Sequence, residues 1–319
     1  MLGNVHINLS LSRNINEIGE FKLVKIVRFL KLIVFAFKIG LKRGLKKVYF
    51  SHTIRSAGFY RDLPVLLILR FFGCRIIYHL HNSSSRFDRM SSILFKGLYK
   101  GSDVVFLADT LVNSRFYTVA GKVSVIHNFS DFGGLGIQSR TSLTNIIYVA
   151  NLHLFKGYEL LLEVCDELDK RGLGFELNIF GADGELTTDS INFYVSSYKS
   201  MKVRAWGEVS REELLKQYLK ADIVMLFSMD EALPLCLVEG MSLGLPIIAT
   251  DIGGVSELVE NEFNGFIVGR NSLEIVEKIQ LLISNPNLLR KFSEAAFSKY
   301  EGFFSKEVYF QKFNQIFKD

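Results

Sequence analysis

Short apolar runs alternate with longer stretches of helical periodicity along most of the chain. The first series of runs falls at 5–9, 48–51, 75–79, 103–107 and 123–126. A second series follows at 145–150, 176–180, 202–206, 222–227, 247–250 and 266–268. The stretches between the runs are of helix length, which is typical of parallel βαβ units. We therefore predict an α/β protein with two Rossmann-like, doubly wound domains that face each other across a cleft.

The alternation lapses at 128–144, where Gly, Ser and Thr accumulate, and we interpret this segment as a linker. The predicted domains are 1–135 and 136–319. Helical patterns at 273–284, 286–300 and 305–317 close the chain, and the last helix is expected to return to the first domain. Ligands of doubly wound sheets bind beyond the C-terminal ends of the strands.

The composition, 49% hydrophobic over 319 residues, is that of a globular protein. Three widely spaced cysteines (Cys74, Cys165 and Cys236) have no metal-like spacing and suit a reducing compartment. No apolar run approaches the roughly 20 residues of a membrane-spanning helix, and no secretory signal is recognisable. We expect a cytoplasmic protein, peripheral at the inner face of the cytoplasmic membrane.

The membrane expectation comes from the charge distribution. Residues 1–140 carry 21 Lys and Arg against 7 Asp and Glu, whereas residues 141–319 carry 17 against 26. Segment 21–47 holds nine basic residues and no acid, with apolar positions between them at helical spacing. Such a helix suits an anionic bilayer, although a solvated basic face on a packed helix remains the alternative. We expect no nucleic-acid partner, because the aromatic residues follow core-like patterns and no binding motif is present.

The most informative segment is 228–246, which reads SMDEALPLCLVEGMSLGLP. A strand ends in a polar loop carrying Glu231, and a helix is predicted to begin at Pro234 as its first residue. The free amides of Leu235 and Cys236 at that helix start would bind an anion such as a pyrophosphate. Glu239 lies inside the helix, and a carboxylate readily accepts hydrogen bonds from sugar or ribose hydroxyls.

The spacing Glu231-x7-Glu239, followed by GLPIIATDIGGVSELV and NGFIV, resembles the family-4 retaining glycosyltransferases of the GT-B fold, the glycosyl transferases group 1 type. The resemblance implies that Glu231 contacts the transferred sugar, that Glu239 binds the nucleotide ribose, and that the Leu235 and Cys236 amides hold the diphosphate. One departure is Gly240, where the family usually has alanine, and glycine weakens a helix by up to about 1 kcal/mol.

Two further segments extend the resemblance. The run from Ile146 to Gly157 is similar to a family pattern in which an arginine and a lysine reach the donor phosphates. The lysine corresponds to Lys156, whereas the arginine position holds Asn151. In the first domain, the loop after 75–79 is where the family places a histidine near the reacting carbon. His81 is the best match and His79 the second, and both are weighed against the usual structural role of a histidine.

The resemblance implies a hexosyl-type glycosyltransferase that uses a nucleotide sugar and a glycan or lipid-linked acceptor, in bacterial surface polysaccharide or lipopolysaccharide synthesis. We expect no cofactor and no metal ion. The N-terminal domain is expected to lack its first βα unit, which would expose a sheet edge and favour an oligomer. The alternatives are a non-hydrolysing sugar-nucleotide epimerase of the same fold and a truncated, inactive relative that acts as a partner subunit.

Overall fold

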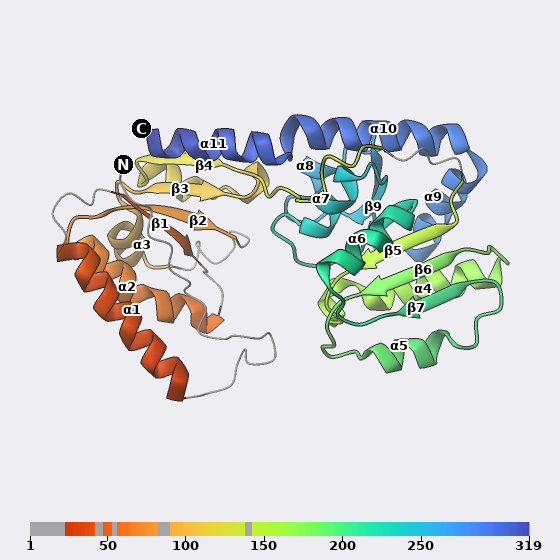
Figure 1. The fold of residues 1–319 in the computed structure, drawn as a ribbon, viewed down its shortest axis with the longest axis horizontal. Helices are drawn as coiled ribbons and strands as arrows, with labels where there is room; N and C mark the ends of the chain where they lie inside the picture. The colour runs from red at the N-terminus through yellow and green to blue at the C-terminus, as the bar shows by residue number, and fades with distance from the viewer. Residues whose placement is uncertain (1–22, 42–46, 53–55, 82–89, 138–141, 319) are drawn as a thin grey trace. The chain divides into compact units, whose positions relative to one another are not determined.

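The computed structural model describes residues 23–41, 47–52, 56–81, 90–137 and 142–318. The chain divides into two compact units (Figure 1). The first unit comprises residues up to 106 together with 112–124, and the second comprises 107–111 and 125–319. The strand predicted at 5–9 lies outside the described residues. Among the described residues, no helix is both long and apolar enough to cross a membrane.

The first unit is built on a parallel sheet with helices between its strands. Its elements are α1 (Leu23–Leu41), β1 (Lys47–His52), α2 (Ser56–Phe71), β2 (Arg75–Leu80), α3 (Ser92–Tyr99), β3 (Asp103–Phe106), the 3-10 helix η4 (Ser114–Thr118) and β4 (Lys122–Val125). The described strands follow the order β1-β2-β3-β4. Each of the four strands predicted after residue 47 is therefore present.

Aromatic side chains fill the core of the first unit. Phe95 of α3 and Phe116 of η4 have ring centroids 4.9 Å apart, and Tyr99 lies 5.0 Å from Phe116. Tyr78 of β2 contacts Tyr99 at 4.8 Å, and these rings are fully buried. Edge-on aromatic packing of this kind connects α3 and η4 to the sheet. It stabilises the fold by more than the burial of apolar surface alone would.

The second unit contains a six-stranded parallel sheet of order β10-β9-β8-β5-β6-β7. The strands are β5 (Asn145–Val149), β6 (Glu176–Phe180), β7 (Lys202–Ala205), β8 (Ile223–Leu226), β9 (Ile247–Thr250) and β10 (Gly265–Val268). The helices are η3 (Asp109–Leu111), η5 (Leu154–Lys156), α4 (Tyr158–Lys170), α5 (Thr188–Val195), α6 (Arg211–Lys220), α7 (Leu235–Ser242), α8 (Val255–Leu258), α9 (Ser272–Ser284), α10 (Pro286–Phe303) and α11 (Lys306–Lys318).

Given this strand order and the right-handed crossovers usual in parallel sheets, α4 and α5 lie on one face and α6, α7 and α8 on the other. Strands β8 and β9 are completely buried, as expected of a sheet covered on both faces. Helix α7 lies very close to β8, because a Cβ atom at Gly240 would be 2.7 Å from Cγ1 of Val224. The glycine that weakens this helix in isolation thus allows its close packing on the sheet.

Candidate donor site in the second unit

The two central strands of the second sheet, β5 and β8, end in loops that carry ionisable side chains. The connection after β5 leads to β6 on one side, and the connection after β8 leads to β9 on the other. This reversal is the topological switch point, where ligands of doubly wound sheets bind. Lys156 follows β5 in η5, and Glu231 lies in the loop between β8 and α7. The fold therefore brings both predicted residues to one place.

Lys156 and Glu231 form an ion pair in this loop cluster. Nζ of Lys156 donates a hydrogen bond to Oε1 of Glu231 at 2.7 Å. The two side chains are only 21% and 13% exposed, so water screens the pair less than it would at an open surface. A ligand that binds Lys156 or Glu231 must therefore break the ion pair between them.

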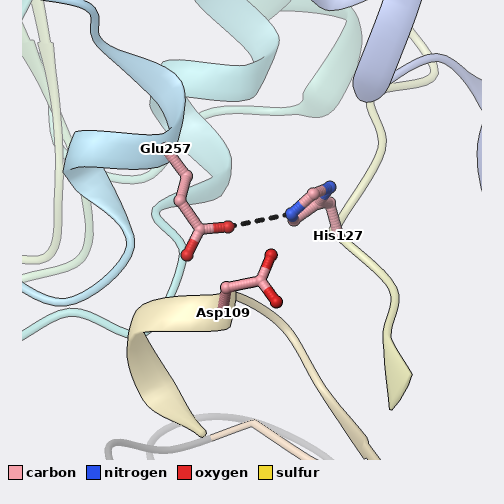
Figure 2. A group of neighbouring side chains, drawn as sticks. All are labelled: Asp109, His127 and Glu257. Atoms are coloured by element: carbon pink, nitrogen blue, oxygen red, sulfur yellow. Dashed lines mark hydrogen bonds and ion pairs between the residues drawn. The ribbon is translucent and has the colours of Figure 1, made fainter.

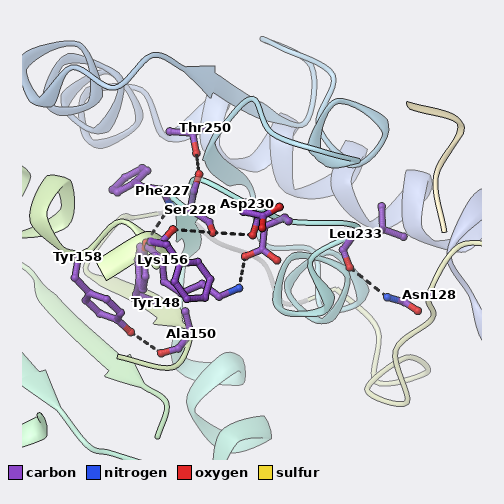
Figure 3. A network of polar contacts seen from close by, with 12 residues as sticks. Asn128, Tyr148, Ala150, Lys156, Tyr158, Phe227, Ser228, Asp230, Leu233 and Thr250 are labelled. Atoms are coloured by element: carbon purple, nitrogen blue, oxygen red, sulfur yellow. Dashed lines mark hydrogen bonds and ion pairs between the residues drawn. The ribbon is translucent and has the colours of Figure 1, made fainter. Parts of the chain in front are cut away.

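Backbone contacts connect the loop of Lys156 to the end of β8. The hydroxyl of Tyr148 donates to the carbonyl of Lys156 at 2.5 Å and accepts from the amide of Phe227 at 3.0 Å (Figure 3). Gly157, the residue after Lys156, has a φ of +84°, and a Cβ atom there would lie 2.1 Å from the carbonyl oxygen of Phe227. Glycine is therefore required both by the left-handed backbone and by the lack of space.

Helix α7 begins at the same edge of the sheet. Pro234 is its N-cap and Leu235 is the first helical residue, so the helix begins one residue later than the sequence pattern predicts. The amides of Leu235 and Cys236 lie in the first turn, where backbone N–H groups have no acceptor within the helix. Burial raises the pKa of the Cys236 thiol. The negative charges of Glu231 and Glu239 raise this pKa further, and the positive charge of Lys156 lowers it. The three charged side chains thus surround the start of α7.

Glu239 lies on the buried side of α7 with 5% of its surface exposed. Nη1 of Arg211 is 3.4 Å from its Oε1. Burial raises the pKa of Glu239, and both Arg211 and a hydrogen bond with Tyr218 oppose that shift. Arg211 and Tyr218 are not marked by any motif in the sequence, because α6 reaches the site only through the crossover between β7 and β8.

The loop 251–254 supports the backbone of Glu231 from a third strand, β9. Gly253 has a φ of +58°, and a Cβ atom there would lie 2.0 Å from the carbonyl oxygen of Glu231. The amide of Gly254 donates to the carbonyl of Ala232 at 2.7 Å. Asn128, from the segment after β4, donates through Nδ2 to the carbonyl of Leu233 at 3.2 Å (Figure 3). The backbone that leads into α7 thus has contacts both with the loop after β9 and with the segment after β4.

A separate polar cluster of the second unit contains Asp109, His127 and Glu257 (Figure 2). Nε2 of His127 is 3.0 Å from Oε2 of Glu257, while the amide and hydroxyl of Thr110 donate to Oε1 at 2.8 and 3.1 Å. Burial raises the pKa of Glu257, but these hydrogen bonds outweigh it and the net pKa is below its ordinary value.

Among the described residues, this cluster is the one group of acids and histidines close enough to hold a metal ion, with ligand atoms within 4.8 Å. Nδ1 of His127 is buried without a partner in the described part of the chain. A metal-binding histidine usually donates from its second nitrogen, so we interpret the cluster as a structural connection between η3, the segment after β4 and α8.

The remaining predicted residues fall in two places. Asn151 lies beyond β5, where its Oδ1 accepts a hydrogen bond from the amide of Ala182 at 3.2 Å. His81 belongs to the first unit, where it is exposed directly after β2. The ring of His79 is buried 4.3 Å from that of His81, and burial, aided by His81, lowers its pKa to about 3. His79 is therefore neutral at physiological pH.

Sequence comparison links the second unit to known proteins. The model of the family "Glycosyl transferases group 1" matches residues 138–299, just over half of the chain. An uncharacterized glycosyltransferase of Haemophilus influenzae is 33% identical over 162 residues, and the amylovoran biosynthesis glycosyltransferase AmsK of Erwinia amylovora is 28% identical over 145 residues. These matches cover 47% and 44% of this chain. The chain spans only 42% and 35% of those relatives' lengths.

Structural comparison covers more of the chain. Alr3699/HepE of Anabaena, solved in complex with UDP-glucose, superposes with a TM-score of 0.70 over 92% of this chain and 82% of its own, at 18% identity. At that identity the likeness establishes the fold, two parallel-sheet α/β domains of the GT-B type, and so confirms the predicted fold class. With the family match over the second unit, it follows that this chain belongs to the group 1 glycosyltransferases.

Proposed function

We propose that this chain is a retaining glycosyltransferase that moves a sugar from a nucleotide-sugar donor to a glycan or lipid-linked acceptor. The observation that carries the proposal is the convergence of Lys156, Glu231, Glu239 and the start of α7 at the switch point of the second sheet. Relatives named for amylovoran and colanic acid biosynthesis support a place in bacterial surface polysaccharide or lipopolysaccharide synthesis.

Each group in the proposed site has a distinct task. The amides of Leu235 and Cys236 and the ammonium of Lys156 would bind the diphosphate, with Asn151 beside them. Glu239 would accept hydrogen bonds from the ribose, and Glu231 from the transferred sugar. The helix N-terminus and Lys156 together balance the negative charge that develops on the leaving diphosphate, and so we propose a reaction without a metal cofactor.

In the proposed reaction, the bond between the anomeric carbon and the phosphate oxygen breaks, and the acceptor oxygen bonds to the same face of that carbon. The acceptor hydroxyl gives its proton to the departing diphosphate. His81 is proposed to bind the sugar or to orient the acceptor. The ion pair between Lys156 and Glu231 must open when the donor enters, since each side chain then acquires a ligand group of its own.

Replacing Glu239 by alanine should weaken the binding of the free nucleoside diphosphate by about tenfold or more, because hydrogen bonds to a charged group contribute about 1.5–3 kcal/mol. Calorimetry with UDP, GDP and ADP measures this, starting from the nucleotide that the wild type binds most tightly. Glu277→Ala, which removes an exposed acid of α9 in the same unit, is the control. Equal affinities for wild type and Glu239→Ala would contradict the ribose role.

We further propose that the first unit associates with an anionic membrane surface through α1. Exposed apolar side chains recur along this helix at three- and four-residue spacing: Val27, Leu30, Val34, Phe37 and Leu41. The exposed Lys31 and Lys38 lie on the same helix, within the basic segment 21–47. Such a helix buries its apolar side between lipid head groups while its lysines meet anionic lipid.

Vesicle co-sedimentation tests this surface. Binding should rise with the fraction of anionic lipid and fall as salt is raised, and Leu30→Glu/Val34→Glu should reduce it at every lipid composition. Leu281→Glu, at an exposed leucine of α9, is the matched control in the second unit. Binding that ignores both salt and the α1 substitutions would mean that α1 is an ordinary solvated helix.

A further inference from the structure

Arg211, the first residue of α6, is held in a fixed position over the carboxylate of Glu239. Its Nη1 lies 3.4 Å from Oε1 of Glu239, and its Nη2 lies 3.7 Å from Oδ2 of Asp131. The guanidinium carbon is 4.6 Å from the centroid of the Phe132 ring. Two carboxylates and one aromatic face therefore orient this side chain, although about half of its surface is exposed.

A second side chain of α6 approaches Glu239 from the interior. Tyr218 follows Arg211 by two helical turns, which places both on one face of α6. Tyr218 is fully buried and donates to the carbonyl of Cys236 at 3.0 Å, and its hydroxyl also acts to lower the pKa of Glu239. The carboxylate of Glu239 thus lies between one cationic and one neutral group of the same helix.

This arrangement matters because Glu239 is buried. A buried carboxyl group without a positive neighbour tends to be protonated, and it then loses part of its capacity to accept hydrogen bonds. Ribose hydroxyls are donors, so an ionised carboxylate in a fixed orientation is the stronger partner for them. The cation that lowers the pKa of Glu239 against the effect of burial, Arg211, is on α6, outside the Glu231–Glu239 motif.

We propose that Arg211 is a positioning residue that holds Glu239 ready for the hydroxyls of the nucleotide ribose, so that α6 takes part in selecting the nucleotide. This inference rests on the proposed function, because it presupposes that Glu239 binds ribose. It adds a residue whose effect is confined to the sugar of the nucleotide: the base and the diphosphate are bound by other groups and should be unaffected.

The test compares nucleotides with and without ribose hydroxyls. UDP, GDP and ADP are screened by calorimetry, and the one that the wild type binds most tightly is carried forward with its 2′,3′-dideoxy counterpart. Wild type should prefer the ribonucleotide by about tenfold or more, since each lost bond to a charged group costs about 1.5–3 kcal/mol. In Arg211→Met the preference should fall to about twofold or less, through weaker binding of the ribonucleotide alone.

Two variants separate positioning from a general structural role. Arg211→Lys keeps the positive charge and should restore part of the preference. Arg171→Met removes the arginine at the C-cap of α4, which pairs with Glu167 at 2.7 Å, and it should behave as wild type. Equal losses of affinity for both nucleotides in Arg211→Met, or a full preference retained in that variant, would overturn the inference while leaving the proposed function intact. Wild type that binds none of the three nucleotides would overturn both.

Discussion

Glu231→Gln is expected to lower the rate of sugar transfer about tenfold or more while nucleoside diphosphate binding stays equal to wild type or becomes tighter. The proposed partner of Glu231 is the transferred sugar, which the free nucleotide lacks. In the structure this carboxylate accepts a hydrogen bond from Lys156 at 2.7 Å. Glutamine cannot form that ion pair, so in the variant the ammonium of Lys156 is available to the diphosphate without first being separated from a carboxylate.

Three further variants make this expectation specific. Lys156→Met should weaken diphosphate binding, because it removes a cation from the phosphate site. The double variant should bind no more tightly than Lys156→Met, since the gain from Glu231→Gln acts through Lys156 and the two effects are not additive. Glu277→Gln, on α9, is the control. Weaker nucleotide binding in Glu231→Gln with an unchanged transfer rate would reverse the roles that we assign to the two side chains.

Gly157→Ala is expected to destabilise the second unit by roughly 2–5 kcal/mol, from an unfavourable backbone conformation together with a steric clash. The φ of +84° disfavours any residue with a Cβ atom, and the added atom would lie 2.1 Å from the carbonyl oxygen of Phe227. That carbonyl also accepts from Nη1 of Arg270 at 3.0 Å, so it has little freedom to move. Donor binding should fall as well, because the shift displaces the adjacent Lys156.

Gly172→Ala is the matched control for the clash. Its φ is +70°, but a Cβ atom there would meet nothing within 4 Å, so we expect only the backbone cost of about 1–2 kcal/mol. Urea unfolding can be followed by the fluorescence of Trp206, the single tryptophan, which lies in the second unit. Equal destabilisation by the two substitutions would show that the loop of Lys156 tolerates a side chain at 157.

The central strands of the second unit were predictable from the sequence because β8 and β9 are buried on both faces. Such strands appear as continuous apolar runs, and the run predicted at 247–250 matches β9 at both ends. The run predicted at 176–180 also matches β6 at both ends, although β6 is only partly buried. The start of α7 was located to within one residue by Pro234. Glu231 and Glu239 were recognised because their spacing lies within one loop and one helix, where residues close in sequence stay close in space.

The first unit shows where local patterns were insufficient. Residues 107–111 follow β3 but group with the second unit, since Thr110 donates to Glu257 and to the carbonyl of Gly253 at 3.0 Å. The pattern of apolar residues predicts a strand that extends through Leu107. Nothing in that pattern indicates that residues 107–111 group with the second unit. The partners of Thr110 lie more than a hundred positions further along the chain, and so hydrophobic periodicity carries no information about them.

The sequence by itself determined the two α/β domains, the position of most strands and the Glu231–Glu239 motif, all of which depend on short-range pattern. The tertiary structure decided which charges meet. Lys156 reaches Glu231 because β5 and β8 are adjacent in the sheet, and Arg211 reaches Glu239 because the crossover after β7 places α6 beside α7. Parallel strands bring their carboxyl ends together regardless of distance along the chain, and so the composition of the site follows from strand order rather than from sequence spacing.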